Sequence, residues 1–181
     1  MLNQLIGRHL DAFGRAFKYD VSYMREILAV SRRAFVHFGH VQSMGKYREG
    51  VPLAPWYAAK LVATLREDCG PCTQLVADMA LRDEVPVPTV RAVVRGRDDD
   101  MDADVRLACH FGRAVLAHDP AADELRAEVV ARWGQRGLVS LAFAMTVARM
   151  YPTLKYALGH GRTCSVVRIE GRDEPAARTA A

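Results

Sequence analysis

Residues 58–81, AAKLVATLREDCGPCTQLVADMAL, place the cysteine pair Cys69 and Cys72 between two stretches that favour helix. The stretch before the pair is rich in alanine, leucine, lysine, arginine and glutamate, which are strong helix formers. After the pair, apolar residues recur at the three- and four-residue spacing of a helix face. Pro71 suits the first turn of this second helix, where a backbone N–H is not needed. The stretch therefore predicts two helices that meet at the cysteine motif.

Helical spacing of apolar residues also runs through most of the remaining chain. Residues 137–159 are apolar nearly all round, which predicts a central buried helix with a kink or break at Pro152 and a stop at Gly159. We expect residues 83–90, DEVPVPTV, to interrupt the helices, because a proline disfavours helix in the residue before it. The other expected helices cover residues 2–17, 22–38, 56–68, 105–118 and 122–133.

The C-terminal part of the chain departs from this helical pattern. Residues 164–170 form the one strand-like run, and residues 171–181 read as a flexible tail. A length of 181 residues suits one domain with a hydrophobic core of its own. We therefore expect an all-α, single-domain helical bundle over residues 1–181, with residues 1–50 as an N-terminal helical extension.

Composition and charge narrow the classes of function. The formal charge of +4 is spread over isolated arginines, with no basic run interleaved with aromatics, so we expect no nucleic-acid partner. Polar residues interrupt the apolar N-terminus, and no uninterrupted apolar stretch is long enough to cross a bilayer. We therefore expect a cytoplasmic protein without a signal peptide or a membrane partner. In that reducing compartment a Cys-x-x-Cys motif is more often catalytic or metal-binding than a structural crosslink.

The cysteine pair leaves three interpretations open: a redox pair, an inert relic of one, or part of a zinc site. Two cysteines at a helix start can form a disulfide, and the unpaired N–H groups there favour a thiolate. Zinc would need two more ligands, and the neighbours Cys109 and His110 point in different directions on a helix, so we expect no metal and no cofactor. Cys109 reads as a small buried hydrophobe, and Cys164 as the same or as an exposed thiol.

An acidic run at residues 98–104, DDDMDAD, mimics the alternating ligands of a calcium loop. It lacks the central glycine and the closing glutamate of such a loop. We therefore expect it to be solvated and to cap the start of the following helix.

The helical flanks of the motif argue against a thioredoxin fold, in which a buried strand leads into the cysteines. Helix, Cys-x-x-Cys, helix, then further helices and a long apolar one, instead resembles the alkylhydroperoxidase D-like (carboxymuconolactone decarboxylase) family. Two stretches carry the resemblance: residues 58–81, and residues 107–159, which begin LACHFGRAVLAHDPAADE and end ARMYPTLKYALG. The resemblance covers roughly residues 52–159, the family-like core.

The resemblance implies a helical homo-oligomer with thiol-dependent, peroxidase-type activity. By this resemblance Cys72 would attack a hydroperoxide and become a sulfenic acid, and Cys69 would then close the disulfide. An external thiol reductant would reset the pair. The implied partners are therefore a hydroperoxide, a thiol reductant and further copies of the chain.

The chain departs from the family pattern at the residues that transfer protons. Peroxidase members carry a glutamate about a dozen residues before the first cysteine, where Tyr57 or a neighbour stands here. Val76 replaces a histidine four residues after the second cysteine, and Pro71 replaces another histidine just before it. General acid–base assistance needs a base within hydrogen-bond reach. The substitutes that we consider are Glu67, Asp68, His110 and His118.

Two other functions stay open beside the peroxidase. One is a non-catalytic oligomeric relative that kept the fold and lost the proton relay. The other is decarboxylase-like or other lyase chemistry, a branch that typically relies on histidine rather than on a cysteine pair.

Overall fold

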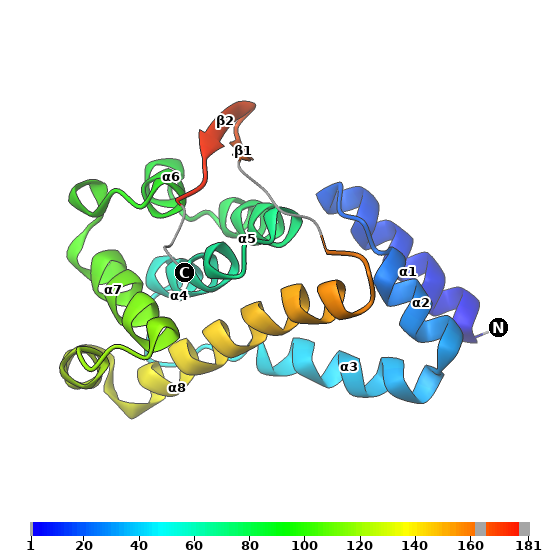
Figure 1. The fold of residues 1–181 in the computed structure, drawn as a ribbon, viewed down its shortest axis with the longest axis horizontal. Coiled ribbons are helices and arrows are strands. Elements are labelled where there is room, and N and C mark those ends of the chain that lie inside the picture. Colours follow the sequence, from blue (N-terminus) through cyan, green and yellow to red (C-terminus); the bar gives the residue numbers. More distant parts are fainter. Residues whose placement is uncertain (1, 162–165, 178–181) are drawn as a thin grey trace.

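The computed structural model describes residues 2–161 and 166–177. These residues are mostly helical, as predicted, with helix α4 (Leu53–Arg66) in the middle. Helix α4 packs against α5 (Gly70–Arg82), α7 (Ala103–Ala117) and α8 (Ala122–Ala157) (Figure 1). The other elements are α1 (Leu2–Phe17), α2 (Ser22–Val30), α3 (Arg32–Met44), α6 (Val87–Arg95), the 3₁₀ helix η1 (Asp98–Asp100), and the strands β1 (Val166–Ile169) and β2 (Arg172–Pro175).

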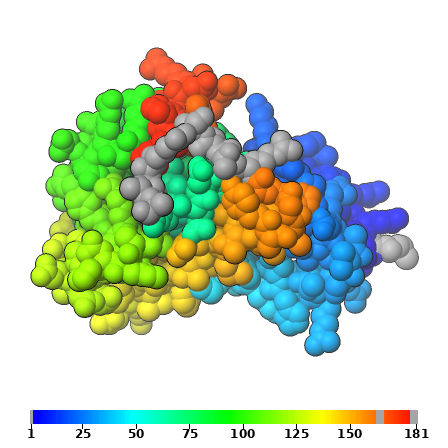
Figure 2. All heavy atoms as spheres, viewed as in Figure 1, coloured from blue at the N-terminus to red at the C-terminus, as the bar shows by residue number. Residues whose placement is uncertain are grey.

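The buried apolar residues fall into two clusters. The larger cluster lies among α4 to α8, and it includes Leu61 and Leu141. The smaller cluster joins α1 and α2 through Leu10 and Tyr23, and it packs against residues of α5 and α8 such as Tyr151. The N-terminal helices therefore form a layer of their own at one end of the molecule, which Figures 1 and 2 show in blue.

The prediction of a single helix over residues 22–38 is wrong, because the helix is interrupted at Ser31. Ser31 has an extended backbone (φ −158°, ψ 113°), and its side chain accepts a hydrogen bond from the backbone N–H of Ala34 at 3.1 Å. Serine is among the preferred residues at this capping position, because its oxygen satisfies an otherwise unpaired N–H group. The break ends α2 at Val30 and starts α3, which leads the chain along α8.

The sequence predicted that residues 83–90 interrupt the helices. The structure corrects this for the second half of the stretch, where α6 begins. Pro86 precedes α6, and Pro88 lies in its first turn. The first turn of a helix tolerates proline, because its N–H would have no partner there and its φ is already helical. Helix α6 ends at Gly96, which has the left-handed backbone (φ 67°) that glycine adopts without strain.

Helix α8 joins the two helices predicted for residues 122–133 and 137–159. Its backbone leaves the helical region at Gly134 (φ 67°, ψ −179°), so the two segments meet at a kink. The sequence predicted a kink or a break at Pro152, and the break is wrong, because the helix continues through Pro152 to Ala157. Gly159 ends the helix with a φ of 76°, as predicted.

Within the described residues, α8 is the one helix that is long and apolar enough to cross a bilayer by length and composition. It packs against α3, α4 and α7, and Leu141 and Ala144 are buried between them. A helix that other helices cover on several sides within a domain can be as apolar as a helix that crosses a membrane.

The C-terminal hairpin corrects the prediction of a flexible tail over residues 171–181. Strand β2 lies in this stretch and pairs antiparallel with β1, while residues 178–181 lie outside the described part. Glu174 of β2 is fully buried and forms ion pairs with Arg91 and Arg95 of α6. Burial opposes ionisation of Glu174, but the hydrogen bonds from the two guanidiniums outweigh it and lower its pKa. The two ion pairs of Glu174 therefore hold the hairpin against α6.

Candidate functional site

The cysteine pair lies where α4 gives way to α5. Cys69 is the last residue before α5, and Cys72 lies in the first turn of that helix, after Pro71. The two cysteines are joined by a disulfide, and their Cα atoms are 5.3 Å apart. The motif therefore opens a helix, as the flanking residues predicted, and both cysteines lie beside the unpaired N–H groups of a helix start.

The two cysteines differ in their surroundings. Cys69 is completely buried, whereas Cys72 lines a cavity of about 510 Å³ between the N-terminal helices and helices α4, α5 and α8. A cavity of this size can hold a small organic molecule. Of the two cysteines, Cys72 is therefore the one placed to meet a ligand. The aromatic residues of the cavity wall include Phe13, Phe17, Tyr19, Tyr23, Trp56 and Tyr57.

Lys60 of α4 lines the same cavity as Cys72. Its Nζ donates a hydrogen bond to the carbonyl oxygen of Gly45 at 2.8 Å and lies 3.2 Å from the centre of the Trp56 ring. Burial lowers the pKa of Lys60 to about 7, against the attraction of Asp83, which acts in the opposite direction. Near neutral pH a large fraction of Lys60 is therefore uncharged, so its amine can accept a proton.

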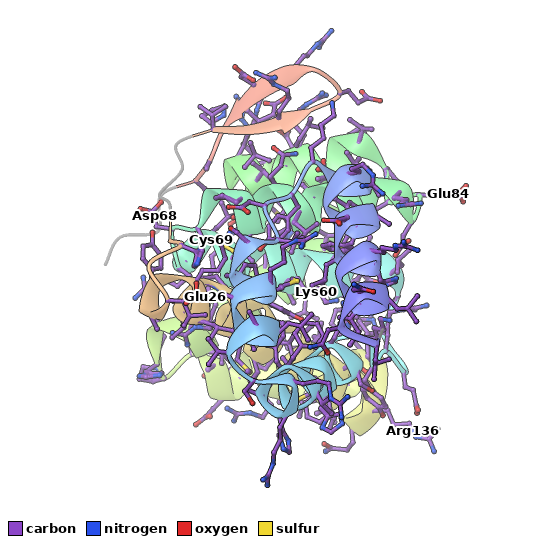
Figure 3. The ribbon with its side chains drawn as sticks, turned by 90° about the vertical axis from the view of Figure 1, so that its right-hand side faces the viewer. Glu26, Lys60, Asp68, Cys69, Glu84 and Arg136 are labelled. Carbon is purple, nitrogen blue, oxygen red and sulfur yellow. A yellow bond between two sulfur atoms is a disulfide. The ribbon has the colours of Figure 1, made fainter. Side chains whose placement is uncertain are left out.

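Tyr57 lies one turn before Lys60 on α4 and connects this helix to the end of α5. Its hydroxyl donates a hydrogen bond to Oδ2 of Asp83 at 2.5 Å. Burial and the bonded carboxylate raise the pKa of Tyr57, so the hydroxyl keeps its proton at neutral pH. Figure 3 shows Lys60 and Cys69 in the interior, behind α1 and α2. The cavity is thus lined by aromatic residues together with Cys72, the hydroxyl-bearing Tyr57 and Lys60, whose amine can be neutral near pH 7.

The four acids and histidines considered as proton-transfer substitutes do not line this cavity. Glu67 forms an ion pair with Arg149 of α8 at 2.5 Å. His110 pairs with an aspartate near the start of α7, and Asp68 and His118 are exposed. The structure brings Lys60 to the cavity instead. The sequence signal for Lys60 is its position as the one charged residue in the otherwise uncharged run of residues 56–65.

Cys109 is fully buried in α7, as predicted, and burial raises the pKa of its thiol to about 12. Such a thiol stays protonated and unreactive at neutral pH. Across residues 2–161 and 166–177, no group of three or more histidine, cysteine, aspartate or glutamate side chains could hold a metal ion. The prediction for Cys164 lies outside the described residues.

The acidic run at residues 98–104 has a structural place at the start of α7. Asp102 caps this helix, as predicted, because its side chain accepts a hydrogen bond from the N–H of Val105 at 2.8 Å. Asp98 accepts two hydrogen bonds from Arg113, at 2.9 and 2.6 Å, and lies 2.9 Å from Nε2 of His110. The hydrogen bonds from Arg113 and His110 lower the pKa of Asp98 to about 2. His110 therefore has a structural partner in Asp98.

We expect Asp98→Asn to lower the free energy of unfolding at neutral pH by about 1 kcal/mol, since the group is 34% exposed and solvent weakens the pair. The folded pKa is below the ordinary value of 3.8, so the stabilisation is present above pH about 4 and is lost as the pH falls towards about 2. Urea unfolding at several pH values measures the effect. The neighbouring Asp99→Asn serves as the control, and an equal loss in both variants would contradict the assignment.

Comparisons with the models of known protein families, with curated proteins and with solved structures find no match for this chain. The functional argument therefore rests on the site itself: a cysteine pair at a helix start, of which Cys72 lines an aromatic cavity that Lys60 also lines.

Proposed function

We propose that this protein is a cytoplasmic, thiol-dependent oxidoreductase that reduces a hydroperoxide through the Cys69–Cys72 pair. The observation that carries the proposal is that Cys72 is bonded to Cys69 and at the same time lines a cavity large enough for an organic substrate. The proposal agrees with the resemblance to the alkylhydroperoxidase D-like family. It includes the helical bundle fold and the homo-oligomeric state that this resemblance implies.

In the proposed reaction, the sulfur of Cys72 attacks an oxygen of the peroxide. The S–O bond forms as the O–O bond breaks, so Cys72 becomes a sulfenic acid and the other oxygen leaves as an alkoxide, which takes up a proton to give an alcohol. The thiol of Cys69 then attacks the sulfenic sulfur, water leaves, and the disulfide forms. An external dithiol reduces this disulfide and is itself oxidised.

Lys60 moves the proton in this proposal. Its neutral amine accepts the proton of the Cys72 thiol, and the resulting ammonium group gives that proton to the departing alkoxide. A pKa of about 7 suits both steps, because the two forms of the side chain are then comparable in population near neutral pH. The helix start of α5 favours the thiolate of Cys72 in addition. Lys60 would thereby serve in place of the glutamate and histidine that the family pattern has.

The test of this function is peroxide consumption with dithiothreitol as the reductant. We expect the wild type to consume cumene hydroperoxide with one dithiol oxidised per peroxide, and Cys69→Ser/Cys72→Ser to show only the uncatalysed rate. Cys109→Ala is the matched control, since this buried cysteine has no part in the cavity. Equal rates for the wild type and the double serine variant would refute the proposal.

A non-catalytic oligomeric role is the alternative function, and the burial of both cysteines favours it. It predicts that the Cys69–Cys72 disulfide of the folded protein resists dithiothreitol, which mass spectrometry of the alkylated protein would show. Lyase chemistry has less support, because no histidine is among the described residues that line the cavity.

A further inference from the structure

The outer part of the cysteine cavity is positively charged. Lys46 and Arg48, after α3, and Arg82, at the end of α5, line the cavity and are exposed. Asp83 is the only acidic residue among the described residues that line it, and its carboxylate is bonded to a tyrosine hydroxyl. The rim therefore has three cations against one carboxylate.

These cations keep hydrogen-bond donors that a ligand can use. The ammonium group of Lys46 makes no hydrogen bond or ion pair with another described residue, and only its backbone N–H is bonded, to the carbonyl oxygen of Ser43 at 3.1 Å. Arg48 donates one hydrogen bond, from Nη1 to the carbonyl oxygen of Val51 at 3.0 Å, which leaves the rest of its guanidinium available. The guanidinium carbon of Arg82 lies 5.2 Å from the centre of an aromatic ring. Guanidinium and ammonium groups of this kind bind carboxylates through charge-assisted hydrogen bonds.

Apart from the amine of Lys60, the interior behind this rim is largely apolar. Tyr19, Tyr23 and Met24 cover it from the N-terminal layer, and Trp56 and Cys72 lie on the opposite side, all of them buried. Such a wall favours hydrocarbon, which gains from leaving water, and disfavours a charge, which would lose its hydration. The cavity therefore changes from apolar at its floor to cationic at its mouth.

We propose that this cavity binds an amphipathic organic anion, whose hydrocarbon part fills the interior and whose acid group lies at the rim of Lys46, Arg48 and Arg82. The identity of the substrate rests on the proposed function: it is an organic hydroperoxide that has an acid group several bonds from the peroxide. The acid group stays in contact with water and the three cations while the peroxide reaches the sulfur of Cys72. The rim then selects acidic hydroperoxides over neutral ones of the same size.

The test is calorimetric binding to the oxidised protein of three eight-carbon probes: octanoate, octan-1-ol and octyltrimethylammonium. We expect octanoate to bind about tenfold more tightly than octan-1-ol, since one well-placed ionic contact is worth about that factor, and the ammonium probe to bind most weakly. The advantage of octanoate should disappear in Lys46→Gln/Arg48→Gln. It should persist in Arg97→Gln/Arg136→Gln, which removes the same charge outside the cavity; Figure 3 shows Arg136 pointing outward.

The inference is overturned if octanoate and octan-1-ol bind equally, if neither binds, or if both double variants lose the same affinity. The oxidised protein has no free thiol at the motif, so this binding does not depend on peroxide chemistry. Binding of octanoate without any peroxide consumption would refute the proposed function alone. Peroxide consumption without binding of octanoate would refute the anion site alone.

Discussion

Replacing Cys72 by serine is expected to bring peroxide consumption down to the uncatalysed rate, whereas Cys69→Ser should still complete a single turnover. The reason is the asymmetry of the pair: Cys72 lines the cavity and Cys69 is buried away from it. Without Cys72 there is no nucleophile for the peroxide, because a serine hydroxyl at neutral pH attacks it far more slowly than a thiolate. Without Cys69 the sulfenic acid on Cys72 forms but has no partner to close a disulfide.

Stopped-flow measurement of peroxide loss without reductant separates these two results. Cys69→Ser should consume about one peroxide per chain and then stop, and dimedone should label Cys72, as seen by the mass of its peptide. The opposite pattern, with a burst in Cys72→Ser, would make Cys69 the attacking residue. It would also remove the cavity from the site of peroxide chemistry.

Replacing Lys60 by methionine is expected to lower kcat/KM for the peroxide by about 10²- to 10⁴-fold, the usual contribution of a positioned proton-transfer group. In the wild type, the rate should rise as the pH passes through about 7, because only the neutral amine can accept the thiol proton. Rates measured on both sides of this pH should show the rise in the wild type and none near this pH in Lys60→Met.

Lys60→Arg is the control that separates proton transfer from charge. Arginine keeps a positive charge in the cavity but does not release a proton, so we expect it to be as slow as methionine. Recovery of the wild-type rate in Lys60→Arg would contradict the role given to Lys60.

The free energy of unfolding, measured for the wild type and for Lys60→Met, should show that the variant is not misfolded. The folded pKa of Lys60 is below its ordinary value of 10.5, so the unfolded chain binds more protons between about pH 7 and 10.5, and wild-type stability rises with pH across that range. Lys60→Met has no charge to desolvate, so it should be at least as stable as the wild type at neutral pH.

The helices around the motif could be predicted because their signals are local. The helix formers before Cys69 and the proline in the first turn of α5 act within a few residues, and the structure agrees with both. The errors at Ser31 and Pro86 are also local, because serine and proline each suit either an interruption or a helix start. Only packing decides between these two outcomes.

The candidate site could be predicted only in part. The cysteine pair was visible as a motif, but the importance of Lys60 depends on a cavity that residues of α1, α2 and α8 complete from distant parts of the sequence. The buried Glu174 was hidden in the same way, because its partners Arg91 and Arg95 lie about eighty residues earlier. Long-range partners of single charged residues leave no periodic pattern in a sequence.

The division of the interior into two clusters has a consequence for how the proposed reductant would reach the buried disulfide. The cavity that Cys72 lines is closed on one side by Phe13, Tyr23 and other residues of α1 and α2, which pack in the smaller cluster. Swinging these helices outward would break that cluster and leave the larger one intact. Such a local opening costs less free energy than global unfolding, so it would uncover Cys72 to the proposed reductant while most of the domain stays folded.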